Sequence, residues 1–155
     1  IEAFKHVHTD KKLVIAGGSS DTDSFMKEME DLAKEDGRIL FTGFVQGQML
    51  EELYSNAYIY TLPSDLEGMP LSLLEAMSYG NCCLVSDIPE CAEVVEDKAL
   101  IFRKSDVNAL REKLQDACDH PEKIKKYKEQ AADFICGKYN WDDVAEETIK
   151  LYRRT

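Results

Sequence analysis

The sequence predicts an α/β fold in which helices cover both faces of a doubly wound parallel sheet. Short segments rich in β-forming residues alternate with longer amphipathic segments, as in sheets whose parallel strands are joined by helices. The run Leu13 to Ala16 is apolar throughout and ends at Gly17-Gly18, which is typical of a buried strand that leads into a tight loop. These two observations favour a single Rossmann-like domain over residues 1–155.

The first half of the chain then alternates helices and strands. Phe25, Met29 and Leu32 recur at helical spacing after the first strand, and Asp21 or Asp23 could cap that helix. We prefer capping to metal binding for Asp21-Thr-Asp23. The same patterns predict a strand over 38–42, a short helix over 49–54 and a strand over 58–62.

The second half adds two strands and most of the helices. Pro70 stands in the first turn of a helix, where its missing N–H costs little. Strands are predicted over 82–85 and 99–102, and helices near 106–118, 121–136 and 141–153. Trp141 heads the last, amphipathic helix, and we expect it to lie in the core. The first strand of the sheet is expected upstream of Ile1.

Ligands of such sheets bind at the carboxyl ends of the strands, in the loops that follow them. The candidate loops are residues 17–21, 43–46, 64–69 and 86–90.

Composition restricts the partners. The net charge of -11 argues against nucleic acid and anionic lipid, because both are bound largely through Lys and Arg. An acidic domain can still hold a phosphate with backbone N–H groups. The five cysteines form no CxxC pair, which predicts no metal site and favours a reducing cytoplasm, with thiols used as small apolar residues.

Glu75 is the most informative single residue. Its helix is apolar or small on nearly every face, which predicts burial, and a carboxylate there is costly unless it is paired or hydrogen-bonded. We therefore expect Glu75 to point at the one opening of the helix, where a hydroxyl-rich ligand could bind it. A structural ion pair or a partly exposed Glu75 is the alternative.

Glu67 and Gly68 stand just before the same helix. A helix N-terminus offers unpaired N–H donors, and Gly68 lets a ligand approach the backbone closely. This segment is a candidate cradle for a diphosphate, although a surface turn would carry the same two residues.

The pattern around these glutamates resembles the E-x7-E signature of the group 1 (family 4) glycosyltransferases of the GT-B fold. The matching residues are Pro63, Ser64, Glu67, Gly68, Leu74, Glu75, Ala76, Met77 and Gly80. Weaker agreement extends over nearly the whole chain, which is similar to the C-terminal, donor-binding domain of that fold.

The resemblance implies roles for particular residues. Glu75 would bind the ribose hydroxyls, and Glu67 would act as the catalytic residue beside the transferred sugar. Residues expected to hold the diphosphate and sugar are Gly68, Met69, Leu71, Gly17 and Gly18, and those expected near the base are Gly43, Phe44 and Val45. The family usually needs no metal, and the nucleotide-diphosphate sugar is a substrate, so no cofactor is implied.

Two departures from the family stand out. Gly68-Met69-Pro70 replaces the common Gly-Phe-Gly, and Pro70 cannot donate a backbone hydrogen bond. The family's basic pair, an arginine and a lysine that grip the diphosphate, is expected upstream of Ile1.

The resemblance thus implies a retaining, metal-independent glycosyltransferase. It would transfer a sugar from a UDP-, GDP- or ADP-sugar to a glycan or lipid-linked acceptor held by an N-terminal domain of the same protein. The helix 141–155 would cross to that domain. We expect a cytoplasmic protein, with any contact at the inner membrane face made by the N-terminal domain. A non-catalytic nucleotide- or sugar-binding module remains the alternative.

Overall fold

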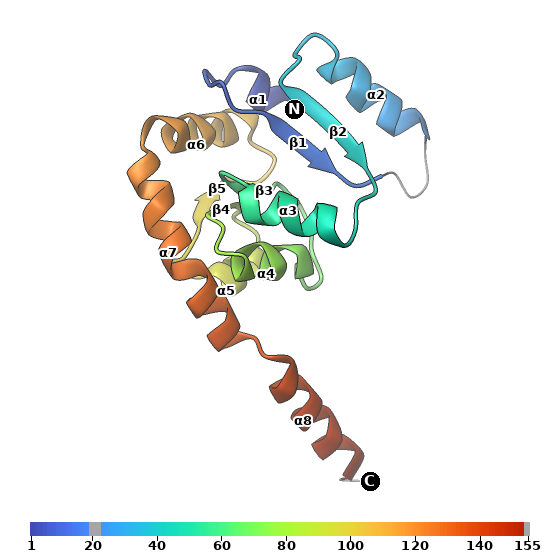
Figure 1. Cartoon of the computed structure of the whole chain (residues 1–155), viewed down its shortest axis with the longest axis vertical. Coiled ribbons are helices and arrows are strands. Elements are labelled where there is room, and N and C mark those ends of the chain that lie inside the picture. The colour runs from blue at the N-terminus through green and yellow to red at the C-terminus, as the bar shows by residue number, and fades with distance from the viewer. Residues whose placement is uncertain (19–22, 154–155) are drawn as a thin grey trace.

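The computed structural model describes residues 1–18 and 23–153, with Asp23 described only in its backbone. The proposed caps Asp21 and Asp23 therefore lie outside the described side chains. Figure 1 shows the arrangement of the elements, which follow one another as α1 Glu2–Lys5, β1 Leu13–Ala16, α2 Asp23–Ala33, β2 Ile39–Gly43, α3 Gln48–Asn56, β3 Tyr60–Leu62, α4 Leu71–Ser78, β4 Cys83–Ser86, α5 Pro89–Val95, β5 Leu100–Phe102, α6 Val107–Asp119, α7 Pro121–Lys138 and α8 Trp141–Arg153. The strands confirm the predicted ones to within two residues at each end.

The strand pairings are parallel, as predicted, but the sheet is in two parts. β1 pairs with β2, and β3, β4 and β5 form a second group in that order. In the described chain no ladder of hydrogen bonds joins β1 to β3. The chain passes from the first group to the second between β2 and β3.

Helices cover both faces of the three-stranded group. Successive residues of a strand point to opposite faces, and the adjacent Cys82 and Cys83 accordingly lie in different apolar cores. Cys83 packs in the core that includes Tyr54, Leu73 and Val94 of helices α3, α4 and α5. A second core holds Cys82 with residues of α6 and α7, namely Ala117 and Ile124. All four residues of β4 are fully buried, as expected for a central strand.

Helix α5 was not predicted. The loop expected over residues 86–90 ends at Ile88, and Pro89 begins a helix at its first position, where proline is favoured. Cys91, Val94 and Val95 are the buried residues of this helix.

The prediction that Trp141 lies in the core is wrong. Its side chain is 79% exposed, and none of the residues of α8 is buried. Figure 1 shows α8 beyond the end of α7 and away from both groups of strands, which agrees with its lack of buried residues.

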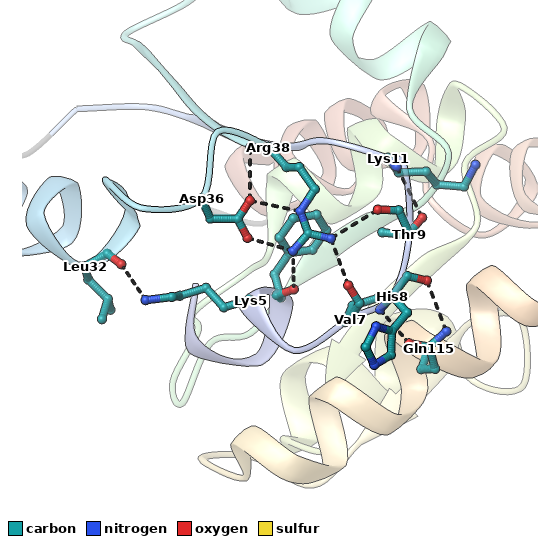
Figure 2. Close-up of polar contacts among 10 residues, drawn as sticks. Lys5, Val7, His8, Thr9, Lys11, Leu32, Asp36, Arg38 and Gln115 are labelled. Carbon is teal, nitrogen blue, oxygen red and sulfur yellow. Dashed lines mark hydrogen bonds and ion pairs between the residues drawn. The ribbon is translucent and has the colours of Figure 1, made fainter.

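A small polar cluster holds the connection between α1 and β1 in place (Figure 2). Arg38 pairs with Asp36 and donates from Nη1 to the carbonyl oxygens of Val7 at 2.8 Å and Thr9 at 3.1 Å. His8 is tied to α6 through Gln115, whose Oε1 accepts from the His8 backbone N–H at 2.8 Å. These contacts fix β1 against the rest of the domain. Within the described ranges, no helix combines the length and apolar character needed to cross a bilayer.

Candidate functional site

The carboxyl ends of β1 and β2 bring two of the predicted glycine segments together. The Gly17 N–H donates to the Gly43 carbonyl oxygen at 2.8 Å. Their φ angles, 129° for Gly17 and 67° for Gly43, are ones that other residues rarely adopt, although neither site lacks space for a side chain. Gly18 follows and is exposed. The tight conformation, more than close packing, explains why glycine stands at both positions.

Phe44 and Val45, predicted to lie near the base, follow Gly43 directly. Phe44 is 77% exposed, whereas Val45 is half-buried. An aromatic ring this exposed beside the end of β2 has little folding role, since burial is what makes such rings stabilising.

The loop between β3 and α4 carries Glu67. The Ser64 Oγ donates to Glu67 Oε1 at 2.6 Å, which holds the half-buried carboxylate against the loop. A second bond, from Ser105 Oγ to Asp65 Oδ1 at 2.7 Å, pins the same loop to the segment before α6. Ser64 therefore holds Glu67 within its loop, and Asp65 ties that loop to the segment before α6.

The start of α4 offers fewer donors than the sequence suggested. Gly68 and Met69 are exposed, and no described backbone bond uses their N–H groups. The Leu71 N–H, in contrast, already donates to the Met69 carbonyl oxygen at 2.8 Å, and Pro70 has no N–H. A ligand would thus meet Gly68 and Met69 first, and a bond to Leu71 would require that local bond to open.

The expectation that α4 is buried on nearly every face is wrong. Glu75 and Leu71 are exposed, and only the opposite side, with Leu73, Ala76 and Met77, is fully buried. Glu75 Oε2 accepts from the Tyr54 hydroxyl at 3.2 Å. In the described chain Glu75 takes part in no ion pair with Lys, Arg or His. The carboxylate therefore keeps its charge unneutralised.

A cavity of about 290 Å³ opens beside Glu75, between α3 and α4. Its lining residues are Gly47, Leu50, Glu51, Tyr54, Glu75 and Tyr79. Of the predicted site residues, only Glu75 lines it.

Sequence reasoning missed the aromatic wall of this cavity. The Tyr54 and Tyr79 rings stack with centroids 5.5 Å apart and planes inclined by 20°. Helical spacing could have indicated it, since residues four apart share a face: Leu50 with Tyr54, and Glu75 with Tyr79. Burial, followed by the nearby Tyr60 and Glu75, raises the pKa of Tyr54, so its hydroxyl keeps its proton at neutral pH.

Metal ligands do not gather at this site. Within residues 1–18 and 23–153, no three His, Cys, Asp or Glu side chains are grouped closely enough to hold a metal ion.

Comparison with known proteins identifies the relatives of the chain. The model of the family Glycosyl transferases group 1 matches residues 1–134. An uncharacterized glycosyltransferase of Methanocaldococcus jannaschii is 29% identical over 92% of this chain and 37% of its own length. The O-antigen chain mannosyltransferase B of Escherichia coli is 28% identical over 91% of this chain and 37% of its own length. The chain thus spans little more than a third of these relatives.

Solved structures show the same fold. The Anabaena protein HepE, solved with UDP-glucose, superposes with a TM-score of 0.91 at 13% identity, over 99% of this chain and 44% of its own. The sucrose-phosphate synthase of Thermosynechococcus elongatus gives a TM-score of 0.82 at 24% identity, over 92% of this chain and 38% of its own. At these identities the likeness establishes the GT-B type of fold.

Proposed function

This chain belongs to the group 1 glycosyltransferases, and on that premise we propose that it is the donor-binding domain of a retaining, metal-independent enzyme. The whole protein would transfer a sugar from a UDP-, GDP- or ADP-sugar to a glycan or lipid-linked acceptor. The nucleoside diphosphate is the leaving group, so the charge that grows on it must be stabilised by N–H donors and by basic groups.

One observation carries the proposal. Glu75 lines a cavity, no described cation pairs with its carboxylate, and that carboxylate accepts one described hydrogen bond, from Tyr54. A carboxylate of this kind accepts hydrogen bonds from neutral hydroxyls, and the two hydroxyls of a ribose match its two oxygens. Glu75 is therefore proposed as the ribose ligand.

Glu67 is proposed as the catalytic residue. It precedes α4 on an anchored loop and accepts a bond from Ser64. There it would contact the hydroxyls of the transferred sugar and support charge at the anomeric carbon. The N–H groups of Gly68 and Met69, close to the positive end of the α4 dipole, would hold the diphosphate.

The split sheet supports a sixth strand contributed by the protein upstream of Ile1. Crossover connections between parallel strands are right-handed. Two successive helices on one face of a sheet therefore carry the chain across that sheet in the same direction, one strand at a time. Phe4 of α1 and Ala33 of α2 share one apolar core with β1 and β2. The strand before α1 therefore belongs on the edge of β1 that β2 leaves free, next to β3.

Inserting that strand gives the order β2-β1-new-β3-β4-β5, which is the common doubly wound order of six strands. β3 and β1 consist of half-buried or exposed residues, as edges left without a neighbour would. In the full-length protein, amide hydrogen exchange in β1 and β3 should be as slow as in β4. Fast exchange in β1 and β3 beside a protected β4 would contradict the insertion.

Helix α8 supports contact with an N-terminal acceptor domain. Its apolar residues form an uncovered surface in the described chain: Trp141 is 79% exposed, Val144 53%, Ile149 46% and Leu151 65%. Exposed apolar area of this kind on one helix is typical of an interface.

The proposed function is tested with the full-length protein. Thermal-shift assays against UDP, GDP, ADP and their sugar conjugates would identify the donor, and transfer or donor hydrolysis would then be measured in Glu67→Ala. Activity lost in Glu67→Ala but kept in Glu129→Ala, an exposed glutamate on α7, supports the enzyme. Full activity in Glu67→Ala would reject the catalytic assignment.

The alternative is a binding module without catalysis. It is favoured by the loss of donors at the start of α4, where Pro70 has no N–H and the Leu71 N–H is already bonded to Met69. A nucleoside diphosphate that stabilises the full-length protein, with no transfer or hydrolysis of any conjugate, would establish it.

A further inference from the structure

The hydroxyl of Tyr54 has one proton and two described acceptors. Glu75 Oε2 lies at 3.2 Å and the Ser72 carbonyl oxygen at 3.4 Å. Hydrogen bonds to an ionised acceptor are the stronger ones, and the carboxylate is also the nearer, so the proton is directed to Glu75.

Resting on the proposed function, we propose that Tyr54 is a positioning residue for nucleotide binding. Its hydroxyl holds Oε2 of Glu75, which sets the carboxylate plane; Oε1 and the remaining acceptor site of Oε2 are then oriented toward the two ribose hydroxyls. Tyr54 itself does not need to touch the nucleotide for this role.

The surroundings make Tyr54 a rigid support. Its side chain is only 8% exposed, and its ring lies between Tyr79, at 5.5 Å, and Tyr60, at 5.9 Å between centroids. The buried Asn81 side chain donates to the Tyr54 carbonyl oxygen at 2.8 Å and to the Ala76 carbonyl oxygen at 3.0 Å. One amide thus joins the backbone beside each partner of the hydroxyl–carboxylate bond.

A neutral donor suits this task better than a cation. A glutamate side chain is flexible, and fixing it before the ligand arrives removes part of the entropic cost of binding. A lysine or arginine would also fix it, but would neutralise the charge that makes the carboxylate a strong acceptor for ribose hydroxyls. Burial keeps Tyr54 protonated, so the phenol remains a donor at neutral pH.

The test separates a positioning role from a structural one by changing the ligand. In the full-length protein, the dissociation constants of UDP, GDP and ADP are measured calorimetrically, and the tightest binder is compared with its 2′,3′-dideoxy form. The variants are Tyr54→Phe, Glu75→Ala and the matched control Tyr60→Phe, which loses a hydroxyl bonded to Ser72 Oγ at 2.9 Å.

Tyr54→Phe is expected to weaken binding of the ribonucleotide about three- to tenfold, the range for one hydrogen bond of ordinary net strength, and to leave binding of the dideoxy form unchanged. Tyr60→Phe should bind both forms as the wild type does. Equal weakening of both forms in Tyr54→Phe would overturn the proposal, because the hydroxyl would then be structural. Wild-type affinity in Tyr54→Phe would overturn it too.

Glu75→Ala shows which idea has failed. If it weakens the ribonucleotide while Tyr54→Phe does not, the ribose site stands and the positioning role is wrong. If Glu75→Ala binds the ribonucleotide as tightly as the wild type, or if none of the three diphosphates binds, the proposed function fails and the positioning role falls with it.

Discussion

Replacing Asn81 by alanine should cost more stability than any comparable asparagine change in the chain. Asn81 is 1% exposed, and its amide donates to the carbonyl oxygens of Tyr54 and Ala76. Each carbonyl keeps one backbone donor at 3.2 Å or longer, from Ala57 for Tyr54 and from the residue 81 N–H itself for Ala76. The variant loses two buried hydrogen bonds, but each carbonyl oxygen keeps one donor. We therefore expect the free energy of unfolding to fall by about 2–3 kcal/mol.

The assay is thermal unfolding of the 155-residue chain. For a domain of this size the loss corresponds to a melting temperature about 4–12 °C lower. Asn56→Ala is the matched control, because Asn56 is exposed and its amide donates to the Glu52 carbonyl oxygen at 2.8 Å within α3. That surface change should cost less than about 0.5 kcal/mol. Equal melting temperatures for the two variants would refute the reasoning that Asn81 joins α3 to α4.

Three further predictions follow from local contacts. Under the proposed function, Ser64→Ala should lower the kcat of the full-length protein up to about tenfold with little change in KM, since Glu67 loses the bond that orients it. A change in KM alone would contradict this. The hydrogen bonds and charge of Arg38 lower the pKa of Asp36 from 3.8 to about 2, so the pair stabilises the folded chain above about pH 4, and this is lost as the pH falls towards 2. Urea midpoints should fall less steeply over that range in Asp36→Asn; identical slopes would show that the pair is not the cause. Ellman's reagent should react fastest with the exposed Cys136. Equally fast modification of Cys82, Cys83 or Cys91 in the folded chain would contradict their burial.

Local patterns predicted the strands because each is a short apolar run bounded by turn residues. β4 is an example: all its residues are buried and its neighbour Cys82 points into the opposite core. The short helix α5 was not predicted, and its first two residues fell in the expected loop 86–90, although Pro89 and Glu90 are typical of a helix start and Cys91, Val94 and Val95 share a face. The prediction for Trp141 failed because the amphipathic pattern of α8 indicates an apolar face that packs against something, but does not tell whether that surface belongs to this domain.

The candidate site was predictable only in part. The E-x7-E spacing singled out Glu67 and Glu75 because both residues belong to one contiguous segment. The contact of Glu75 with Tyr54 joins residues 21 positions apart and depends on how α3 packs against α4. The sequence pattern of either helix alone does not show how the two helices pack. The cavity and its tyrosine wall could therefore be recognised only in the structure.

The most direct measurement is a crystal structure of the full-length protein with its nucleoside diphosphate bound. The account predicts that ribose hydroxyls lie within about 3.2 Å of Glu75, with the Tyr54 hydroxyl still on the same carboxylate. A nucleotide whose ribose lies elsewhere, or a Glu75 paired with a lysine or arginine from the upstream part of the protein, would contradict it.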